Sequence, residues 1–576
     1  MTLHKFAAII SRVGGRHKVE RRTPLFSIPF DRVGRPPTMH AIGWTMKKDS
    51  LLKSTSSFSL ATLISRVLGL VRDSCIAALI PAAWQDIFWL GFRIPSTFRQ
   101  LFAEGALSAA FIPLLSRVRA QEGEEEGKKL GSAVFYLLTL TVGAVCAAAV
   151  VLSPWFVPFL LNFPDDPGAG AAVMSNVSPY GDWRVEAGVK ATQIMFPFLF
   201  FVALAAWAMG VLNTYRYFFI PAMASSFFNV SLIAGSFIAA AYYEGMAQMW
   251  VMGLAVVTGG LLQFAVQIPP TWQVGYFPLR RVSPFSPKVR KFLWMLAPSV
   301  FGLAIYQINA LITQTYFATH YGEGGVSQMN YAFRLIQFPL GVVGVALATA
   351  SFPRIAQYIS QENHQDAAQT LVDVIKYLML MMIPSAVGFI VLGQDITALI
   401  YDRGKFHEEQ WLQPTNSVLG MYALGLLSYT VVKVLVQAFQ AHHDFRTPVI
   451  TGSIAVACNI ALCAVFVAGG WPLWSLALAS AIASTLHTGL LLHLLLGRMK
   501  ALRMGPIADF FLRVLVASLG MAAACWLAMR IFPAAGGTNL GWGLRVGFGI
   551  GLSLLVYGAL GRFLFPVELG RILRLK

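Results

Sequence analysis

The chain has 576 residues, of which 56% are hydrophobic and only 12% are charged, and its formal net charge is +18. A soluble protein of this size carries roughly twice that charged fraction. Several apolar runs reach about 20 residues, which is long enough to cross a bilayer. The composition therefore excludes an ordinary soluble protein and predicts an all-α polytopic membrane protein.

The N-terminal segment differs from the rest of the chain. Residues 1–45 carry eight Lys or Arg residues against two acidic residues and contain no long apolar run. The stretch Phe6–Ile10 is too short for the core of a signal peptide. We interpret residues 1–50 as a disordered basic arm. An over-long translation start is the alternative, because Met46 lies directly before two lysines and the first predicted span.

Fourteen candidate membrane spans follow this arm, and an even number places both termini on one side of the membrane. They lie near residues 54–80, 85–113, 130–161, 187–213, 217–243, 247–268, 292–319, 326–352, 367–393, 413–440, 448–469, 473–496, 508–532 and 541–564. A long basic connector divides them into a lobe of six spans at 51–270 and a second lobe of six at 271–500. Two extra spans occupy 501–576. Paired six-helix lobes of this kind occur in transporters.

The basic residues of the loops predict the orientation of the spans. Most of them lie on the face shared with the N-terminus: Arg117, Arg119, Lys128, Lys129, Arg216, Arg280, Arg281, Lys288, Arg290, Lys291, Arg354, Arg446, Arg498, Lys500, Arg503, Arg571, Arg574 and Lys576. The opposite loops hold mainly Arg184, Arg403 and Lys405. This asymmetry predicts that both termini are cytoplasmic. It also explains the positive net charge, so we do not expect nucleic acid as a partner.

Charged residues concentrate in the first two spans, where they are costly. The residues concerned are Arg66, Arg72, Asp73, Asp86, Arg93, Arg99 and Glu104. Each charge near the bilayer centre costs about 2.5–3.5 kcal/mol on an insertion scale. Arg66 and Asp73 are seven positions apart and share one helix face, as do Asp86 and Arg93. We expect these side chains to face one another or a water-filled cavity.

A second polar group lies in spans seven and eight. Its members recur at helical spacing, seven apart in one span and 4-then-3 apart in the next: Gln307 and Gln314, then Asn330, Arg334 and Gln337. Together with the first two spans they predict a cavity with an excess of positive charge for an anionic ligand. Arginine suits a phosphate because its planar fork donates two hydrogen bonds. Structural ion pairs between helices are the alternative, and Lys433 either joins the cavity or extends toward the membrane surface.

Patterns of enzymes and metal sites are missing from the sequence. The segment Gly123–Lys129 is one residue too short for a phosphate-binding loop and lacks its Ser or Thr. The ten histidines and five cysteines show no ligand spacing. We therefore predict a transporter without metal or cofactor. The last span carries Gly543, Gly547 and Gly551 at a four-residue spacing, which predicts close helix packing there.

Several ordered motifs resemble those of one known family. They are SRVLGLVRD at 65–73, FAEGA at 102–106, YAFRL at 331–335, FP at 338–339, GVVGVAL at 341–347, DRGKF at 402–406, VKVL at 432–435 and TP at 447–448. Together with Asp86, this set resembles the MurJ (MviN) lipid II flippase family of the MOP superfamily. The resemblance runs from about Leu51 to the end of the chain and covers none of residues 1–45.

The resemblance implies a fourteen-helix flippase in the bacterial inner membrane, with two six-helix lobes around a cavity and a lipid-tail groove at the last two helices. The substrate would be lipid II, the undecaprenyl-diphosphate-linked precursor of peptidoglycan, carried to the periplasmic leaflet by alternating access. The resemblance gives four arginines to the substrate diphosphate: Arg66, Arg72, Arg99 and Arg334. Membrane lipids and other cell-wall synthesis proteins are the further partners, and the membrane potential or ions could drive transport.

Six further residues complete the expected site as cavity or gate positions: Asp73, Asp86, Arg93, Glu104, Gln337 and Lys433. Three positions depart from the family pattern. Gln100 and Gln337 stand where relatives often have Arg and Glu. His442 stands where many have Arg or Lys, the expected partner of the gate acid Glu104. These departures leave the cavity arginines in place but put the pairing at that gate in doubt.

Two other classes of function stay open. One is a different MOP-type transporter, such as a drug exporter or a flippase for another polyprenyl-linked oligosaccharide. The other is a membrane enzyme acting on the same lipid, which would need a catalytic acid or base near the periplasmic surface. Its candidates are Asp165, Asp166, Asp402, Glu408 and Glu409, all of which read more simply as solvated loop acids.

Overall fold

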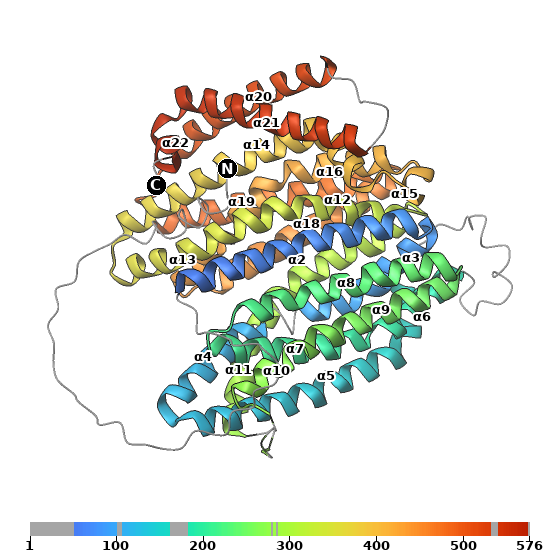
Figure 1. Cartoon of the computed structure of the whole chain (residues 1–576). Helices are drawn as coiled ribbons and strands as arrows, with labels where there is room; N and C mark the ends of the chain where they lie inside the picture. The colour runs from blue at the N-terminus through green and yellow to red at the C-terminus, as the bar shows by residue number, and fades with distance from the viewer. Residues whose placement is uncertain are drawn as a thin grey trace.

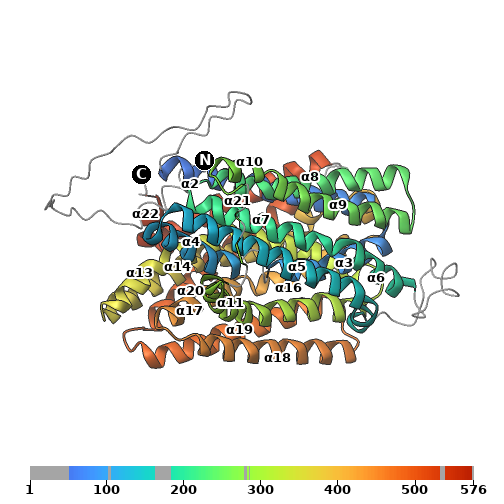
Figure 2. The same cartoon turned by 90° about the horizontal axis from the view of Figure 1, so that it is seen from below.

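A computed structural model of the chain describes residues 51–100, 106–161, 183–277, 280, 282–283, 286–531 and 539–573. The predicted arm at 1–50 and the gate acid Glu104 lie outside these residues. Within them every regular element is helical. The helices run roughly along one common direction (Figures 1 and 2). We call the end of the bundle where α2 begins the proximal end, and the end where α2 stops at Leu79 the distal end.

We call α2 to α10 the first half of the bundle. Its helices are α2 (Leu51–Leu79), α3 (Ala82–Arg99), α4 (Ala106–Glu122), α5 (Glu124–Leu160), α6 (Trp183–Met195), α7 (Pro197–Thr214), α8 (Phe219–Tyr242), α9 (Met246–Ala265) and α10 (Ile268–Gln273). Helix α2 packs along α8, α8 along α9, and α3 along α6. Pro95 lies inside α3, while Pro197 begins α7 at a position where a helix tolerates proline.

The second half runs from α11 to α19. It contains α11 (Pro287–Leu311), η3 (Ile312–Phe317), α12 (Gly325–Pro339), η4 (Leu340–Gly344), α13 (Val345–Ser360), α14 (His364–Tyr401), α15 (Lys405–Glu408), α16 (Leu412–Leu424), α17 (Leu426–Ala441), α18 (Arg446–Ala468) and α19 (Trp474–Arg498). The segments η3 and η4 are π-helical turns, and η4 directly follows Pro339. Such π-helical turns are rare in proteins, and those that occur are often found at functional sites.

Three helices close the chain: α20 (Gly505–Ile531), α21 (Asn539–Leu564) and α22 (Pro566–Leu573). Helices α20 and α21 pack on each other and on α14, along one side of the bundle (Figure 1). Asp395 of α14 forms a 3.0 Å ion pair with Arg545 of α21. The prediction of close helix packing is wrong for Gly547 and Gly551, because a Cβ at either position would meet open space.

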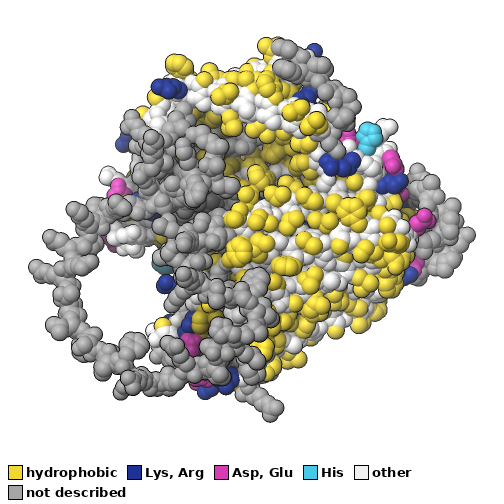
Figure 3. All heavy atoms as spheres, in the orientation of Figure 1, with side chains coloured by type: hydrophobic (Ala, Val, Ile, Leu, Met, Phe, Trp, Pro, Cys, Tyr) yellow, Lys and Arg dark blue, Asp and Glu magenta, His cyan; other side chains and the backbone are white. Residues whose placement is uncertain are grey.

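The surface of the bundle is that of a multi-pass membrane protein. Ten helices in the described part of the chain are long and apolar enough to span a bilayer. Large apolar side chains such as Trp155, Phe159 and Phe563 are 69%, 82% and 83% exposed. Hydrophobic side chains cover much of the face shown in Figure 3. Such a surface suits lipid, because soluble proteins rarely expose continuous apolar patches of this extent.

Four of the fourteen predicted spans fall outside that set of ten. They correspond to α2, to α3 with α4, to α11 with η3, and to α12 with η4 and α13. All four are helical over the residues that the structure describes, so these segments were predicted at the right places. These same four segments carry most of the polar residues of the cavity described next.

Candidate functional site

A polar cavity of about 550 Å³ lies where the two halves of the bundle meet. Helices α2, α3, α7, α8 and α9 line it from the first half, and α11, η3, α12, η4 and α17 from the second. Among the described residues, the lining holds six basic side chains and no acidic one. The six are Arg66, Arg72, Arg93, Arg99, Arg334 and Lys433. The cavity is therefore suited to an anion.

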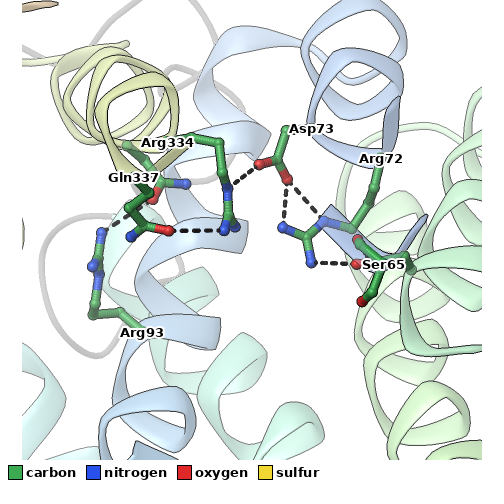
Figure 4. Close-up of polar contacts among 8 residues, drawn as sticks. Ser65, Arg72, Asp73, Arg93, Arg334 and Gln337 are labelled. Atoms are coloured by element: carbon green, nitrogen blue, oxygen red, sulfur yellow. Dashed lines mark hydrogen bonds and ion pairs between the residues drawn. The ribbon is translucent and has the colours of Figure 1, made fainter. Parts of the chain in front are cut away.

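Asp73 joins the two halves at the edge of this cavity (Figure 4). Its Oδ1 accepts hydrogen bonds from Nε and Nη2 of Arg72, at 2.8 and 2.6 Å. Its Oδ2 accepts from Nε of Arg334, on α12, at 2.5 Å. The Asp73 side chain is fully buried, and Arg72 is only 4% exposed. One carboxylate thus holds two guanidinium groups, one from each half of the bundle.

Arg66 and Arg93 donate hydrogen bonds to neutral groups, and so does a second nitrogen of Arg334. Arg66 Nη1 donates to the backbone oxygen of Gln337 at 3.5 Å, and Arg334 Nη1 donates to the Gln337 side chain at 3.2 Å. Arg93 Nη2 donates to Asn330 across the halves at 3.3 Å. Neutral acceptors orient a guanidinium without cancelling its charge. These contacts with neutral groups therefore do not neutralise the guanidinium groups that make them.

Asn229 is a site residue that the sequence analysis missed. It lies on α8, where its Oδ1 accepts from Arg72 Nη1 at 3.0 Å and its Nδ2 donates to the Ser65 backbone oxygen at 2.9 Å. Asn229 is 6% exposed and lines the cavity. The available signal was a single amide side chain in an otherwise apolar span. Asn229 therefore fixes the Arg72 head against α2.

Asp86 lies away from this cavity, near the distal end. Its carboxylate accepts the N–H groups of Gly324 and Ser327 at 2.6 and 2.8 Å and the Ser327 hydroxyl at 2.6 Å. Asp86 is 2% exposed and caps the first turn of α12 from the other half of the bundle. Such a cap satisfies backbone donors that a helix start leaves free. Its predicted neighbour Arg93 shares its helix face but not its surroundings.

The distal end is closed by further buried contacts between the halves. The Tyr331 hydroxyl donates to Gln85, whose amide nitrogen donates to Ile80 O at 2.6 Å. The Ser74 hydroxyl of α2 donates to Ile400 O at 2.5 Å. Tyr331 also packs on Trp89, Tyr401 and Phe406 with ring centroids 4.9–6.0 Å apart. We call these contacts, with the Asp86 cap, the distal seal.

The proximal end is closed by more exposed groups. Lys288 of α11 pairs with Glu122 of α4 at 2.5 Å and with Glu126 of α5 at 2.7 Å. These three side chains are 33–44% exposed. Deeper in, Gln307 Nε2 donates to Gln100 Oε1 at 2.6 Å. The expected gate pair stays a prediction, since Glu104 is outside the described residues and His442 Nδ1 contacts Ala438 O at 2.9 Å.

The structure thus brings together most of the predicted site. Seven of the ten predicted residues line one cavity: Arg66, Arg72, Arg93, Arg99, Arg334, Gln337 and Lys433. Asp73 bonds two of them directly. Asp86 lies in the distal seal. In the described part of the chain no group of three or more His, Cys, Asp or Glu residues could hold a metal ion.

Comparisons with known proteins agree on one family. The family profile described as Lipid II flippase MurJ matches residues 76–541. Lipid II flippase MurJ of Burkholderia cenocepacia is 32% identical over 407 residues, covering 69% of this chain and 75% of that protein. A probable lipid II flippase MurJ of Rhizobium meliloti is 31% identical and covers 84% and 89% of the two chains.

Solved structures give the same result for the fold. A lipid II flippase MurJ in an inward closed conformation superposes with a TM-score of 0.69 at 25% identity, covering 88% of this chain and 99% of that one. An inward-facing multidrug resistance MATE transporter of the MOP superfamily gives a TM-score of 0.57 at 13% identity, covering 78% and 98%. The second likeness concerns the fold alone.

Proposed function

The chain belongs to the MurJ family of lipid II flippases, and on that premise we propose that it carries lipid II across the bacterial inner membrane. Lipid II combines a polyprenyl tail, a diphosphate and a disaccharide-pentapeptide headgroup. The observation that carries the proposal is the cavity with six basic lining residues and no acidic one among the described residues. A drug cation would be repelled by this lining, whereas a diphosphate would be attracted to it.

In this proposal the diphosphate binds between Arg72 and Arg334, with Arg66 and Arg99 as further donors. The guanidinium heads of Arg72 and Arg334 are fixed by Asp73, so little side-chain entropy is lost when an anion arrives. Each can offer the N–H donors that Asp73, Asn229 and Gln337 do not occupy. Lys433 adds an ammonium group, a compact charge without the planar donor geometry of a guanidinium.

We further propose that transport is by alternating access of two lobes, at 51–270 and 271–500. The cavity of about 550 Å³ is within the range for a drug-sized ligand, and a disaccharide-pentapeptide is larger than that. The described structure is accordingly a closed state that must open to admit the headgroup. Release would require the distal seal to break, because its contacts join α2 and α3 to α12 and α14.

The loop charges support an orientation with the proximal end in the cytoplasm and both termini there. Lipid II would then enter from the cytoplasmic leaflet and leave toward the periplasm, while residues 501–576 would form the groove for its tail. Basic residues that move with the lobes could couple transport to the membrane potential, at about 2.3 kcal/mol per charge per 100 mV.

The test is an assay of exposed lipid II in cells depleted of their own flippase. A membrane-impermeant reagent that modifies only outward-facing headgroups would be applied with and without this chain. We expect the chain to restore exposed lipid II. An accumulation of total lipid II with none exposed, despite correct insertion, would contradict the proposal and favour another polyprenyl-linked substrate. Product formation by the purified protein would instead favour a membrane enzyme.

The matched variants are Arg334→Ala and Arg530→Ala. Arg334 lines the cavity and bonds Asp73, whereas Arg530 lies near the distal end of α20 and stacks over Trp526 at 4.6 Å. We expect Arg334→Ala to abolish exposure of lipid II while insertion stays normal, and Arg530→Ala to keep both. Full activity of the Arg334 variant would remove this residue from the diphosphate site.

A further inference from the structure

We propose that the cavity contains a second subsite, formed by Gln307, Ala310 and Gln314 on one wall, that binds hydroxyl and amide groups of the substrate's headgroup. We call it the amide subsite. This inference rests on the proposed function, because it assigns one part of lipid II to one part of the cavity. The chemistry recognised is that of sugar hydroxyl and peptide N–H groups.

The amide subsite is a continuous uncharged strip in a basic cavity. Its three members are the cavity-lining residues of α11 and η3, and all three are neutral. Their spacing of three and then four positions places them on one helix face. Ala310, with its small side chain, lies between the two longer amides along this face. The basic lining residues come instead from α2, α3, α12 and α17.

Gln314 carries the strongest signal within this strip. It is 5% exposed, and its Oε1 has no hydrogen-bond partner among the described residues. Its Nε2 lies 3.5 Å from the Tyr422 hydroxyl, at the limit of a hydrogen bond. A buried amide oxygen without a donor is unfavourable. The side chain also lies in the π-helical turn η3, a type of turn that is frequent at functional sites.

The polarity of this free atom selects the ligand. An amide oxygen is an acceptor and needs a donor, such as a sugar hydroxyl or a peptide N–H group. An ionised diphosphate offers only acceptor oxygens, so it gains nothing at Gln314 Oε1. The diphosphate therefore belongs with the arginines, and the headgroup belongs with the amide wall.

Two lipids separate the two subsites experimentally. Undecaprenyl diphosphate has the tail and the diphosphate without the headgroup, whereas lipid II has all three. Binding of each would be measured to the purified full-length protein in lipid nanodiscs. Gln314→Met keeps the length of the side chain and removes its amide. We expect lipid II affinity to fall about 3- to 10-fold, the loss of one hydrogen bond, with undecaprenyl diphosphate affinity unchanged.

The chain offers a matched control in Gln248. This residue is 6% exposed and also has an Oε1 without a partner, but it lies on α9 and is not a lining residue of the cavity. Gln248→Met should leave the affinity for both lipids unchanged. Arg334→Ala should weaken both lipids together. If Gln314→Met does not insert, Gln307→Met tests the same wall with the same expected selectivity.

The outcomes distinguish the subsite from the function as a whole. If Gln314→Met leaves the affinity for lipid II intact, or weakens both lipids equally, the amide subsite is overturned while the flippase proposal stands. If the unsubstituted protein binds neither lipid, the proposed function fails and the subsite fails with it. Selective loss of lipid II affinity in the Gln314 variant alone supports the assignment.

Discussion

Replacing Asp73 with asparagine would remove the carboxylate charge at the edge of the cavity while nearly preserving the volume of the side chain. The carboxylate accepts three hydrogen bonds, two from Arg72 and one from Arg334. Asparagine keeps one acceptor oxygen, but its NH₂ group would face a guanidinium donor. The variant therefore leaves two guanidinium groups close together without their shared counter-ion.

The expected cost follows from these contacts. Hydrogen bonds to charged groups contribute about 1.5–3 kcal/mol each, so three would give roughly 4.5–9 kcal/mol. That sum is an upper bound, because asparagine retains one acceptor and Arg334 can move toward the cavity. Removing one partner of a buried ion pair costs about 3–5 kcal/mol in other proteins. We expect Asp73→Asn to lower the free energy of unfolding by about 3–5 kcal/mol.

The measurement is unfolding of the purified protein in mixed micelles by increasing denaturing detergent. Asp395→Asn is the matched control, because Asp395 accepts from only one arginine, Arg545, at 3.0 Å, and Arg545 is partly exposed. We expect a smaller loss for this control. Adding Arg334→Gln to Asp73→Asn should recover part of the stability, since the unpaired charge is then removed.

A loss below about 1 kcal/mol for Asp73→Asn, the range of an exposed ion pair, would refute the reasoning. It would mean that water or lipid reaches these groups and that the buried geometry around Asp73 does not exist in the membrane. Equal losses for Asp73→Asn and Asp395→Asn would contradict the special place of Asp73 between the halves.

Two further predictions concern glycines where the halves meet. A Cβ at Gly341 would lie 2.1 Å from Arg66 Nη1, so Gly341→Val should displace this flexible arginine. We expect the amount of lipid II exposed outside the cell to fall about 10-fold or more, the scale of one lost charged hydrogen bond, while membrane insertion stays normal. An unchanged amount of exposed lipid II would show that Arg66 is not needed at this position. Gly404 has φ +52° and approaches Ala78 O, which a Cβ would meet at 2.1 Å. Gly404→Ala should therefore weaken the distal seal, which increased labelling of a cysteine introduced there would detect; unchanged labelling would show that the closed state tolerates the methyl group.

Helical periodicity explains why so much of the cavity could be predicted. Charges and amides in apolar spans are costly, so they must share a face, and a period of 3.6 residues identifies that face. Gln307, Gln314, Asn330, Arg334 and Gln337 were assigned to polar stripes on this basis, and all five line the cavity. The spans themselves could be located from their length and apolar character.

Contacts between distant segments could not be predicted in this way. Periodicity paired Asp73 with Arg66, but Asp73 instead bonds its neighbour Arg72 and a residue 261 positions away. Periodicity also placed Asp86 on the same helix face as Arg93, although Asp86 caps α12 of the second half. Such partners depend on how the halves pack, which a single span does not encode.

The glycines of the last span show the same limit. A four-residue spacing says that Gly547 and Gly551 lie on one face, but not which face meets another helix. In the structure a different glycine, Gly549, is the one in close approach, since a Cβ there would lie 2.9 Å from Leu392. The spacing of the glycines therefore identifies residues that share a helix face, but it does not predict which face packs against another helix.

The two ends of the bundle are closed by different kinds of contact, and salt should act on them differently. The ion pairs of Lys288 with Glu122 and Glu126 are partly exposed, so mobile ions screen them over about 8 Å at physiological ionic strength. The cap at Asp86 is buried and largely escapes such screening. A rise in salt at the proximal end consequently favours opening there while the distal end stays shut. The composition of the solution on that side thus becomes part of the balance between conformations.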